Sequence, residues 1–142
     1  MKNWKLSALI MMALLGLFVC NYSIAADGKE AKAVETSKKW LSLVDDGKYS
    51  DSWETAADYF KAAITKTQWV QAITGVRKPL GKVISRTLKS KQYRTTLPGA
   101  PDGEYLIIQF ETSFDNKKTG IETITPMLDK DGVWRVSGYY IK

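Results

Sequence analysis

Apolar residues recur at helical spacing through the first half of the chain, which predicts about three helices. The first helical stripe ends at Asp46-Gly47, where glycine favours a helix end. A second stripe begins at Asp51-Ser52-Trp53-Glu54, which resembles a capping box, and a third runs from Thr67 to the residue before Pro79. The stripe positions are Val34, Ser37, Leu41 and Val44; Trp53, Ala56, Ala57, Phe60 and Ile64; and Trp69, Ile73 and Val76.

Alternation with a period of two replaces helical spacing after residue 81 and predicts four strands, at 82–92, 104–114, 121–128 and 133–141. Turn-forming residues separate them, including Asp131-Gly132 before the last strand. On that strand Trp134, Val136, Gly138 and Tyr140 should share one face. We therefore expect an α+β fold, with about three N-terminal helices on one face of a curved four-stranded antiparallel sheet. The best-fitting architecture is cone-like, of the cystatin or nuclear-transport-factor-2 type.

A secretory signal peptide is predicted at the N-terminus. Lys2 and Lys5 precede an apolar run from residue 6 to residue 19, and small residues surround Ala25. Fourteen apolar residues rise only about 21 Å as a helix, short of the roughly 30 Å bilayer core, so no permanent membrane span is expected. The bulky Val19 before Cys20 argues against a lipoprotein signal, so lipidation at Cys20 is the lesser alternative. We expect cleavage after Ala25, one α+β domain over residues 26–142, and a periplasmic or secreted location.

The predicted cleavage removes Cys20, the only cysteine, from a chain that has no histidine. This composition excludes disulfides, cysteine nucleophiles, serine–histidine–aspartate triads and zinc sites of the histidine/cysteine type. The acidic turn at Asp129–Gly132 lacks the further carboxylates of a calcium loop. We therefore predict no metal, no cofactor and no assigned catalytic residue.

Basic residues are concentrated in the middle of the chain. Residues 59–101 hold nine basic residues and no acidic one, whereas the flanks are mildly acidic. Such a segment can attract phosphates, anionic lipid headgroups or acidic envelope polymers. The alternative is an ordinary solvated surface, with lysines that discourage pairing at a sheet edge. Nucleic acid is not expected as a partner. The basic segment is represented by Arg77, Lys78, Lys82, Lys89, Lys91 and Arg94.

Several short motifs together resemble a known family. They are Trp40-Leu41 with Asp45, Gly47 and Ser52-Trp53; Arg77-Lys78-Pro79-Leu80-Gly81; Leu97-Pro98-Gly99-Ala100-Pro101-Asp102-Gly103-Glu104-Tyr105; and Asp131-Gly132 followed by Trp134-Arg135-Val136 and Gly138-Tyr139. The set resembles a bacterial exported family known as domain-of-unknown-function family number four-thousand-nineteen. The resemblance spans nearly all of the chain after the signal peptide. It implies export and the cone-like fold, and it carries no catalytic residues.

Arg86 and Glu122 are the leading candidates for a site. Alternation places Arg86 on the side of Ile84 and Leu88, the predicted helix-covered face, and Glu122 shares that face. A charge there is costly unless it is paired, so we expect the two side chains to approach each other. They either bind an anionic ligand or form an ion pair that fixes the strand register.

Two further groups could recognise a ligand. The loop from Leu97 to Tyr105 is stiffened by prolines, and Pro98, Pro101, Asp102 and Tyr105 are its candidate residues. The alternative is a connection that needs unusual backbone angles at its glycines. Three aromatic residues of the last predicted strand could line a pocket or belong to the core, namely Trp134, Tyr139 and Tyr140.

The sequence favours an exported, non-enzymatic binding or accessory protein whose partner is an envelope protein or a small anionic ligand. One alternative is a small-molecule isomerase or dehydratase, with Glu122 as base and Tyr140 or Tyr59 as proton donor. Another is a peripheral module that holds anionic envelope surface through residues 59–101. An enclosed pocket lined by Glu122 and a tyrosine hydroxyl would favour the enzyme, whereas a filled core would exclude both the enzyme and a small ligand bound inside the cone.

Overall fold

The computed structural model describes the backbone of residues 7–142 and the side chains of residues 26–142. The chain divides into two units, Met1–Ala31 and Lys32–Lys142. The predicted signal peptide, with Cys20, lies outside the residues described with side chains, and its cleavage stays a prediction. Among the described residues, no helix is both long and apolar enough to cross a membrane.

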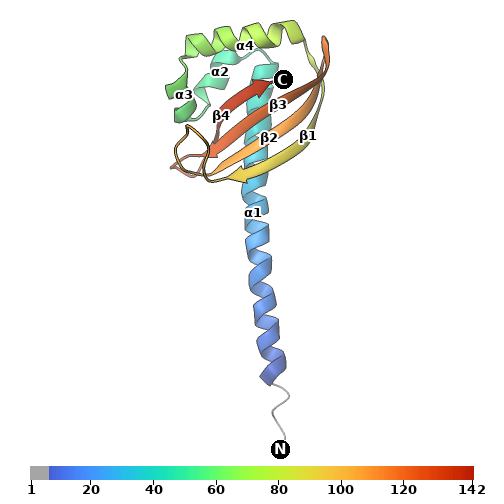
Figure 1. The fold of residues 1–142 in the computed structure, drawn as a ribbon, viewed down its shortest axis with the longest axis vertical. Helices are drawn as coiled ribbons and strands as arrows, with labels where there is room; N and C mark the ends of the chain where they lie inside the picture. The colour runs from blue at the N-terminus through green and yellow to red at the C-terminus, as the bar shows by residue number, and fades with distance from the viewer. Residues whose placement is uncertain (1–6) are drawn as a thin grey trace, which may run out of the picture. The chain divides into compact units, whose positions relative to one another are not determined.

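Four helices precede a meander of four antiparallel strands in the described chain (Figure 1). The sheet order is β1-β2-β3-β4, so each strand pairs with its neighbour in sequence. The predicted α+β class and the single four-stranded antiparallel sheet are confirmed. The elements are α1 (Ser7–Asp45), α2 (Tyr49–Glu54), α3 (Asp58–Ala63), α4 (Lys66–Leu80), β1 (Val83–Arg94), β2 (Tyr105–Phe114), β3 (Lys117–Leu128) and β4 (Trp134–Ile141).

The helices differ from the prediction because a tertiary hydrogen bond interrupts the second one. The expected helix through Trp53 and Ile64 is divided into α2 and α3, and the Ala57 N–H donates to the carbonyl of Val136 at 2.8 Å. The capping box predicted at residues 51–54 is absent. A capping box instead starts α4, where Thr65 and Gln68 exchange hydrogen bonds.

An aromatic cluster fills the space between the helices and the covered face of the sheet. Trp40 lies 5.7 Å from Trp69 and 5.4 Å from Tyr139, measured between ring centroids. Ser52 joins the indoles, since its carbonyl accepts from Trp40 Nε1 at 2.7 Å and its hydroxyl accepts from Trp69 Nε1 at 2.9 Å. Even-numbered β2 residues from Leu106 to Phe114 point into the same buried layer. The helix-covered face of the sheet is therefore a packed core.

Four register shifts interrupt the described sheet, and the three that lie in β1 and β4 change which side chains face that core. Ile84 and Lys89 are extra residues in β1 relative to β2, and Ser137 is an extra residue in β4 relative to β3. The prediction that Ile84 lies on the covered face is wrong, because this bulge residue is 65% exposed. Leu88 does pair with the core residue Phe110, but it is exposed because β1 is the edge strand.

The bulge in β4 also corrects the predicted position of Tyr140. Thr125 pairs with Gly138, whereas Pro126 pairs with Val136, so the alternation reverses across Ser137. Tyr140 is 51% exposed, although Trp134 and Val136 are buried as predicted. A proline cannot donate to the strand ladder, which explains why the register shifts beside Pro126.

Candidate functional site

Glu122 is the centre of a buried polar network that joins all four strands. Its side chain is 0% exposed and accepts a two-point ion pair from Arg86, with Nε–Oε1 at 2.7 Å and Nη2–Oε2 at 3.2 Å. Thr112 of β2 donates to Oε1 at 2.5 Å, and the hydroxyl of Tyr139 of β4 donates to Oε2. The predicted approach of Arg86 and Glu122 is confirmed as a contact.

Arg86 extends the network to the helices. Its guanidinium also binds Asp45, the last residue of α1, with Nη1–Oδ2 at 2.7 Å and Nη2–Oδ1 at 3.0 Å. Arg77 of α4 donates to the same carboxylate through Nη2 at 2.8 Å. The network thus connects α1 and α4 to every strand, and it holds two positive and two negative charges.

Arg77 occupies a core position although it carries a charge. Only 4% of its side chain is exposed, and its guanidinium lies 5.2 Å from the ring centroid of Phe114, within cation–π range. Its Nε and Nη1 make no hydrogen bond with the part of the chain described here. On α4, Arg77 follows Trp69 and Ile73 at steps of four residues, so it lies on the buried stripe of the helix. Val76 was predicted to be buried on this helix, but it is exposed.

The network shifts the pKa values of its members in directions that stabilise the charges. Burial acts to raise the pKa of Asp45, but hydrogen bonds from Arg86 and Arg77 outweigh it and lower that pKa. Burial acts to lower the pKa of Arg86, and its two carboxylate partners raise it instead. Burial, followed by the charge and hydrogen bond of Glu122, raises the pKa of Tyr139. All of these groups keep their ordinary protonation state at neutral pH.

The geometry at Glu122 favours a structural role. Two N–H donors of Arg86 and the hydroxyls of Thr112 and Tyr139 already surround its two oxygens, and no part of the side chain reaches solvent. A general base must reach the proton that it removes, and this carboxylate is enclosed by its own partners. The predicted partner tyrosines lie elsewhere: Tyr140 is exposed, and the hydroxyl of Tyr59 donates to the carbonyl of Gly99 at 2.8 Å.

Two tyrosine hydroxyls bind the backbone of the loop from Leu97 to Tyr105. The Tyr59 bond holds Gly99, and the hydroxyl of Tyr105 donates to the carbonyl of Pro101 at 2.5 Å. Tyr105 was predicted as a recognition residue, but it is fully buried, whereas Pro98, Pro101 and Asp102 are exposed. Gly99 has a φ of +76°, so the prediction that the loop needs unusual backbone angles at its glycines is correct there. Gly103 does not have a positive φ.

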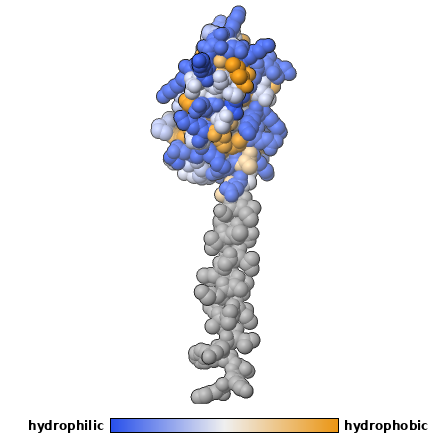
Figure 2. All heavy atoms as spheres, turned by 90° about the vertical axis from the view of Figure 1, so that its right-hand side faces the viewer, coloured by the Kyte–Doolittle hydropathy of each residue, from blue (hydrophilic) through white to orange (hydrophobic). Residues whose placement is uncertain are grey.

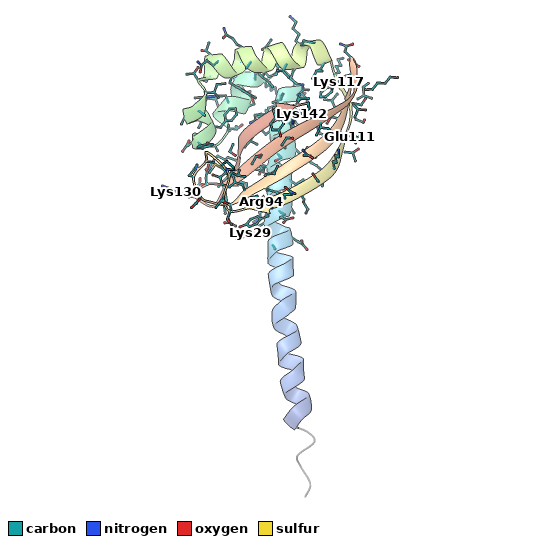
Figure 3. The ribbon with its side chains drawn as sticks, viewed as in Figure 1. Lys29, Arg94, Glu111, Lys117, Lys130 and Lys142 are labelled. Atoms are coloured by element: carbon teal, nitrogen blue, oxygen red, sulfur yellow. The ribbon has the colours of Figure 1, made fainter. Side chains whose placement is uncertain are left out.

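The basic segment is divided between the core and the surface. Arg77 belongs to the buried network, as does Arg86, so these two guanidiniums are compensated by carboxylates. The prediction that Arg77 contributes to a basic surface is therefore wrong. Residues Lys78, Lys82, Lys89, Lys91 and Arg94 are exposed. Figure 3 shows Arg94 at the end of β1 that lies away from Glu111 and Lys117.

An acidic hollow of about 740 Å³ lies beside the turn between β3 and β4. Arg135 binds Asp129 and Asp131 there, each at 2.8 Å, and these bonds keep the two carboxylates in the turn. Asp131-Gly132 forms the predicted hairpin turn, since Gly132 has a φ of +78° and its N–H donates to the carbonyl of Asp129. Among the described residues, no group of three or more histidine, cysteine, aspartate or glutamate side chains is arranged to hold a metal ion.

Asp45 and Thr112 were missed as site residues by sequence reasoning, whereas Arg77 was predicted for the basic surface and Tyr139 for a pocket; each of the four left a signal in the sequence. Asp45 and Arg77 are opposite charges on the apolar stripes of two predicted helices. Thr112 is the polar member of an otherwise apolar β2 face. Tyr139 was assigned the wrong face because the bulge beside Pro126 was not anticipated.

Residues 36–139 match the model of a family described as a protein of unknown function, DUF4019. This range covers most of the chain and includes all six residues of the network. The family predicted from the sequence motifs is confirmed. Among curated proteins, no match is found.

Proposed function

This chain belongs to the DUF4019 family of proteins of unknown function, and we propose that it is an exported, non-enzymatic binding or accessory protein that recognises an anionic partner through strand β1. The binding surface is the exposed basic side chains along and beside β1, namely Lys82, Lys89, Lys91 and Arg94. We refer to this set as the β1 basic surface.

The separation of charge on this domain carries the proposal. The two basic residues of the segment that face the core, Arg77 and Arg86, are neutralised there by Asp45 and Glu122. The basic residues that remain at the surface of β1 lie on an edge strand that pairs only with β2 in the described sheet. Figure 2 shows that the side of the domain carrying β1 is largely hydrophilic, with a few separate hydrophobic patches. A surface of this kind attracts anions through their charge.

The cellular location of the protein is part of the same proposal. The N-terminal pattern of basic end, apolar run and small-residue site supports a bacterial exported protein, cleaved after Ala25, that works in the periplasm or outside the cell. After cleavage the chain keeps 19 basic and 15 acidic residues, a net charge of +4. The curved sheet with helices on one face is also compatible with the cone-like, nuclear-transport-factor-2-like architecture.

The enzyme alternative has weaker support. It needs a substrate to reach Glu122, and this side chain is enclosed by four hydrogen bonds and a packed aromatic core. The same contacts are what an ion pair that fixes the strand register requires. We therefore assign the network to stability and the β1 basic surface to binding.

Fluorescence anisotropy with a labelled peptide of ten glutamates tests this function. We expect binding at about 0.01 M salt that is largely lost at about 1 M, because the screening length falls from about 30 Å to about 3 Å. The variant Lys82→Glu/Lys89→Glu/Arg94→Glu should lose binding. The matched control Lys32→Glu/Lys38→Glu/Lys48→Glu changes exposed residues on and just after α1 by the same charge and should retain most of it. Equal loss in both variants, or no binding by the wild type, contradicts the proposal.

A further inference from the structure

The two edges of the sheet differ in how their backbones are covered. At the β4 edge, the chain between α2 and α3 makes one backbone hydrogen bond with the strand, from the Ala57 N–H to the Val136 carbonyl at 2.8 Å. At the other edge, β1 pairs with β2 on one side only, and no described strand pairs with its other side. An edge strand left in this way presents main-chain donors and acceptors to another chain.

The bulges divide β1 into two regular stretches. Register is continuous from Ser85 to Leu88 and again from Ser90 to Arg94, with Lys89 as the extra residue between them. The second stretch is five residues long, and all five are exposed. A partner strand needs this kind of unbroken register to form a ladder, so Ser90–Arg94 is the stretch of β1 best suited to accept one.

Side chains on this stretch offer both apolar and charged contacts. Tyr93 pairs with the core residue Leu106 and Arg94 with Tyr105, so these two point to opposite faces of the sheet. Tyr93 is exposed, as is Leu88 just before the bulge. An added strand would therefore meet an aromatic ring on one face, with its hydroxyl donating to Glu104. On the other face it would meet a guanidinium that donates to the Tyr93 carbonyl and to the Gln92 side chain.

Charge decides between the candidate occupants. If a second copy paired its own Ser90–Arg94 antiparallel here, Arg94 would lie opposite Ser90 and Lys91 opposite Tyr93. The two strands would then bring four basic side chains together with no acidic side chain on either strand, which is unfavourable. An acidic strand would meet opposite charges at the same positions. The lysines and bulges of β1 therefore disfavour pairing with a second copy, and its positive charge favours an acidic partner strand.

We propose that β1 takes an extended acidic segment of a partner protein as a fifth strand of the sheet, paired along Ser90–Arg94. The inference rests on the proposed function and adds the manner of binding. Main-chain hydrogen bonds would supply affinity, and the alternate side chains would supply the preference for acidic sequence.

Two peptides of equal charge test the strand pairing in the full-length protein. The first alternates glutamate with valine over seven residues, because valine favours an extended strand. The second has the same sequence with every amide nitrogen methylated, which removes the main-chain donors from both edges of the strand. Dissociation constants come from fluorescence anisotropy at low salt, and backbone hydrogen exchange of β1 is measured with and without each peptide.

We expect the unmethylated peptide to bind at least tenfold more tightly and to slow exchange of the Ser90–Arg94 amides. Binding of both peptides with equal affinity overturns strand addition but leaves the proposed anionic binding intact. If neither peptide nor the ten-glutamate peptide binds, both fail. Tighter binding to vesicles containing anionic lipid than to the peptide would assign the edge to a membrane and overturn the inference, as would concentration-dependent pairing of β1 with itself.

Discussion

Replacement of Glu122 by glutamine is the sharpest test of the role assigned to the buried network. Glu122→Gln keeps the shape of the side chain and removes its charge. Arg86, only 16% exposed, then loses one of its two carboxylates and keeps Asp45. Breaking a buried ion pair from one side costs about 3–5 kcal/mol, and the retained Asp45 contact places this case near the lower limit, at about 3 kcal/mol.

Urea unfolding followed by tryptophan fluorescence measures this cost, because Trp40 and Trp69 lie in the core beside the network. With a urea m-value of about 1.5 kcal/mol/M, the unfolding midpoint should fall by about 2 M. Glu35→Gln is the matched control, since it makes the same chemical change in an exposed ion pair with Lys39, and it should leave the midpoint unchanged. If both variants shift the midpoint equally little, the network does not stabilise the fold and this assignment is wrong.

Three other predictions follow from the same structure. Tyr139→Phe should lower the free energy of unfolding by about 2 kcal/mol, because a buried hydroxyl bond to a charged group is lost, whereas Tyr140→Phe should have no effect; equal effects in urea unfolding would refute the assigned bulge register. The free energy of unfolding should be level between about pH 5 and pH 9, because the chain has no histidine. The free energy of unfolding should fall below about pH 4, because Asp45 is then protonated and its lowered pKa no longer favours folding. It should also fall above about pH 10, because the raised pKa of Tyr139 favours folding only while the unfolded tyrosine stays protonated. A free energy of unfolding that instead changes between pH 6 and 8 would contradict this prediction. Gly81→Ala should destabilise by about 2 kcal/mol, because φ is +77° and an added Cβ lies 2.8 Å from Asp115 Cβ, whereas Gly75→Ala on open helix α4 should stabilise by about 1 kcal/mol; thermal melts that rank the two the other way would contradict this reasoning.

The strands were predictable from sequence because alternation and turn residues are local signals. Asp131-Gly132 marks its hairpin in the sequence, and the structure forms a turn there. The break between α2 and α3 was not predictable in this way. It depends on a hydrogen bond from Ala57 to Val136, a residue 79 positions further along the chain, and no local pattern encodes that contact.

The candidate site shows the same division between local and long-range information. Arg86 and Glu122 could be paired from sequence because each places a charge on a face that is otherwise apolar. The face of Tyr139 could not be read by alternation alone, since one extra residue at Ser137 reverses it. The division of the basic segment into buried and exposed members also needed the structure, because Arg77 and its neighbour Lys78 are both basic and face different directions on α4.

Anionic partners should bind at β1, and a heteronuclear NMR titration with the ten-glutamate peptide locates the binding through the backbone amide shifts. We expect the largest shift changes to fall within residues 82–94 and to disappear at high salt. Shift changes centred instead on the loop at 97–103 or the turn at 129–133, or spread evenly over the exposed lysines of α1, would contradict it.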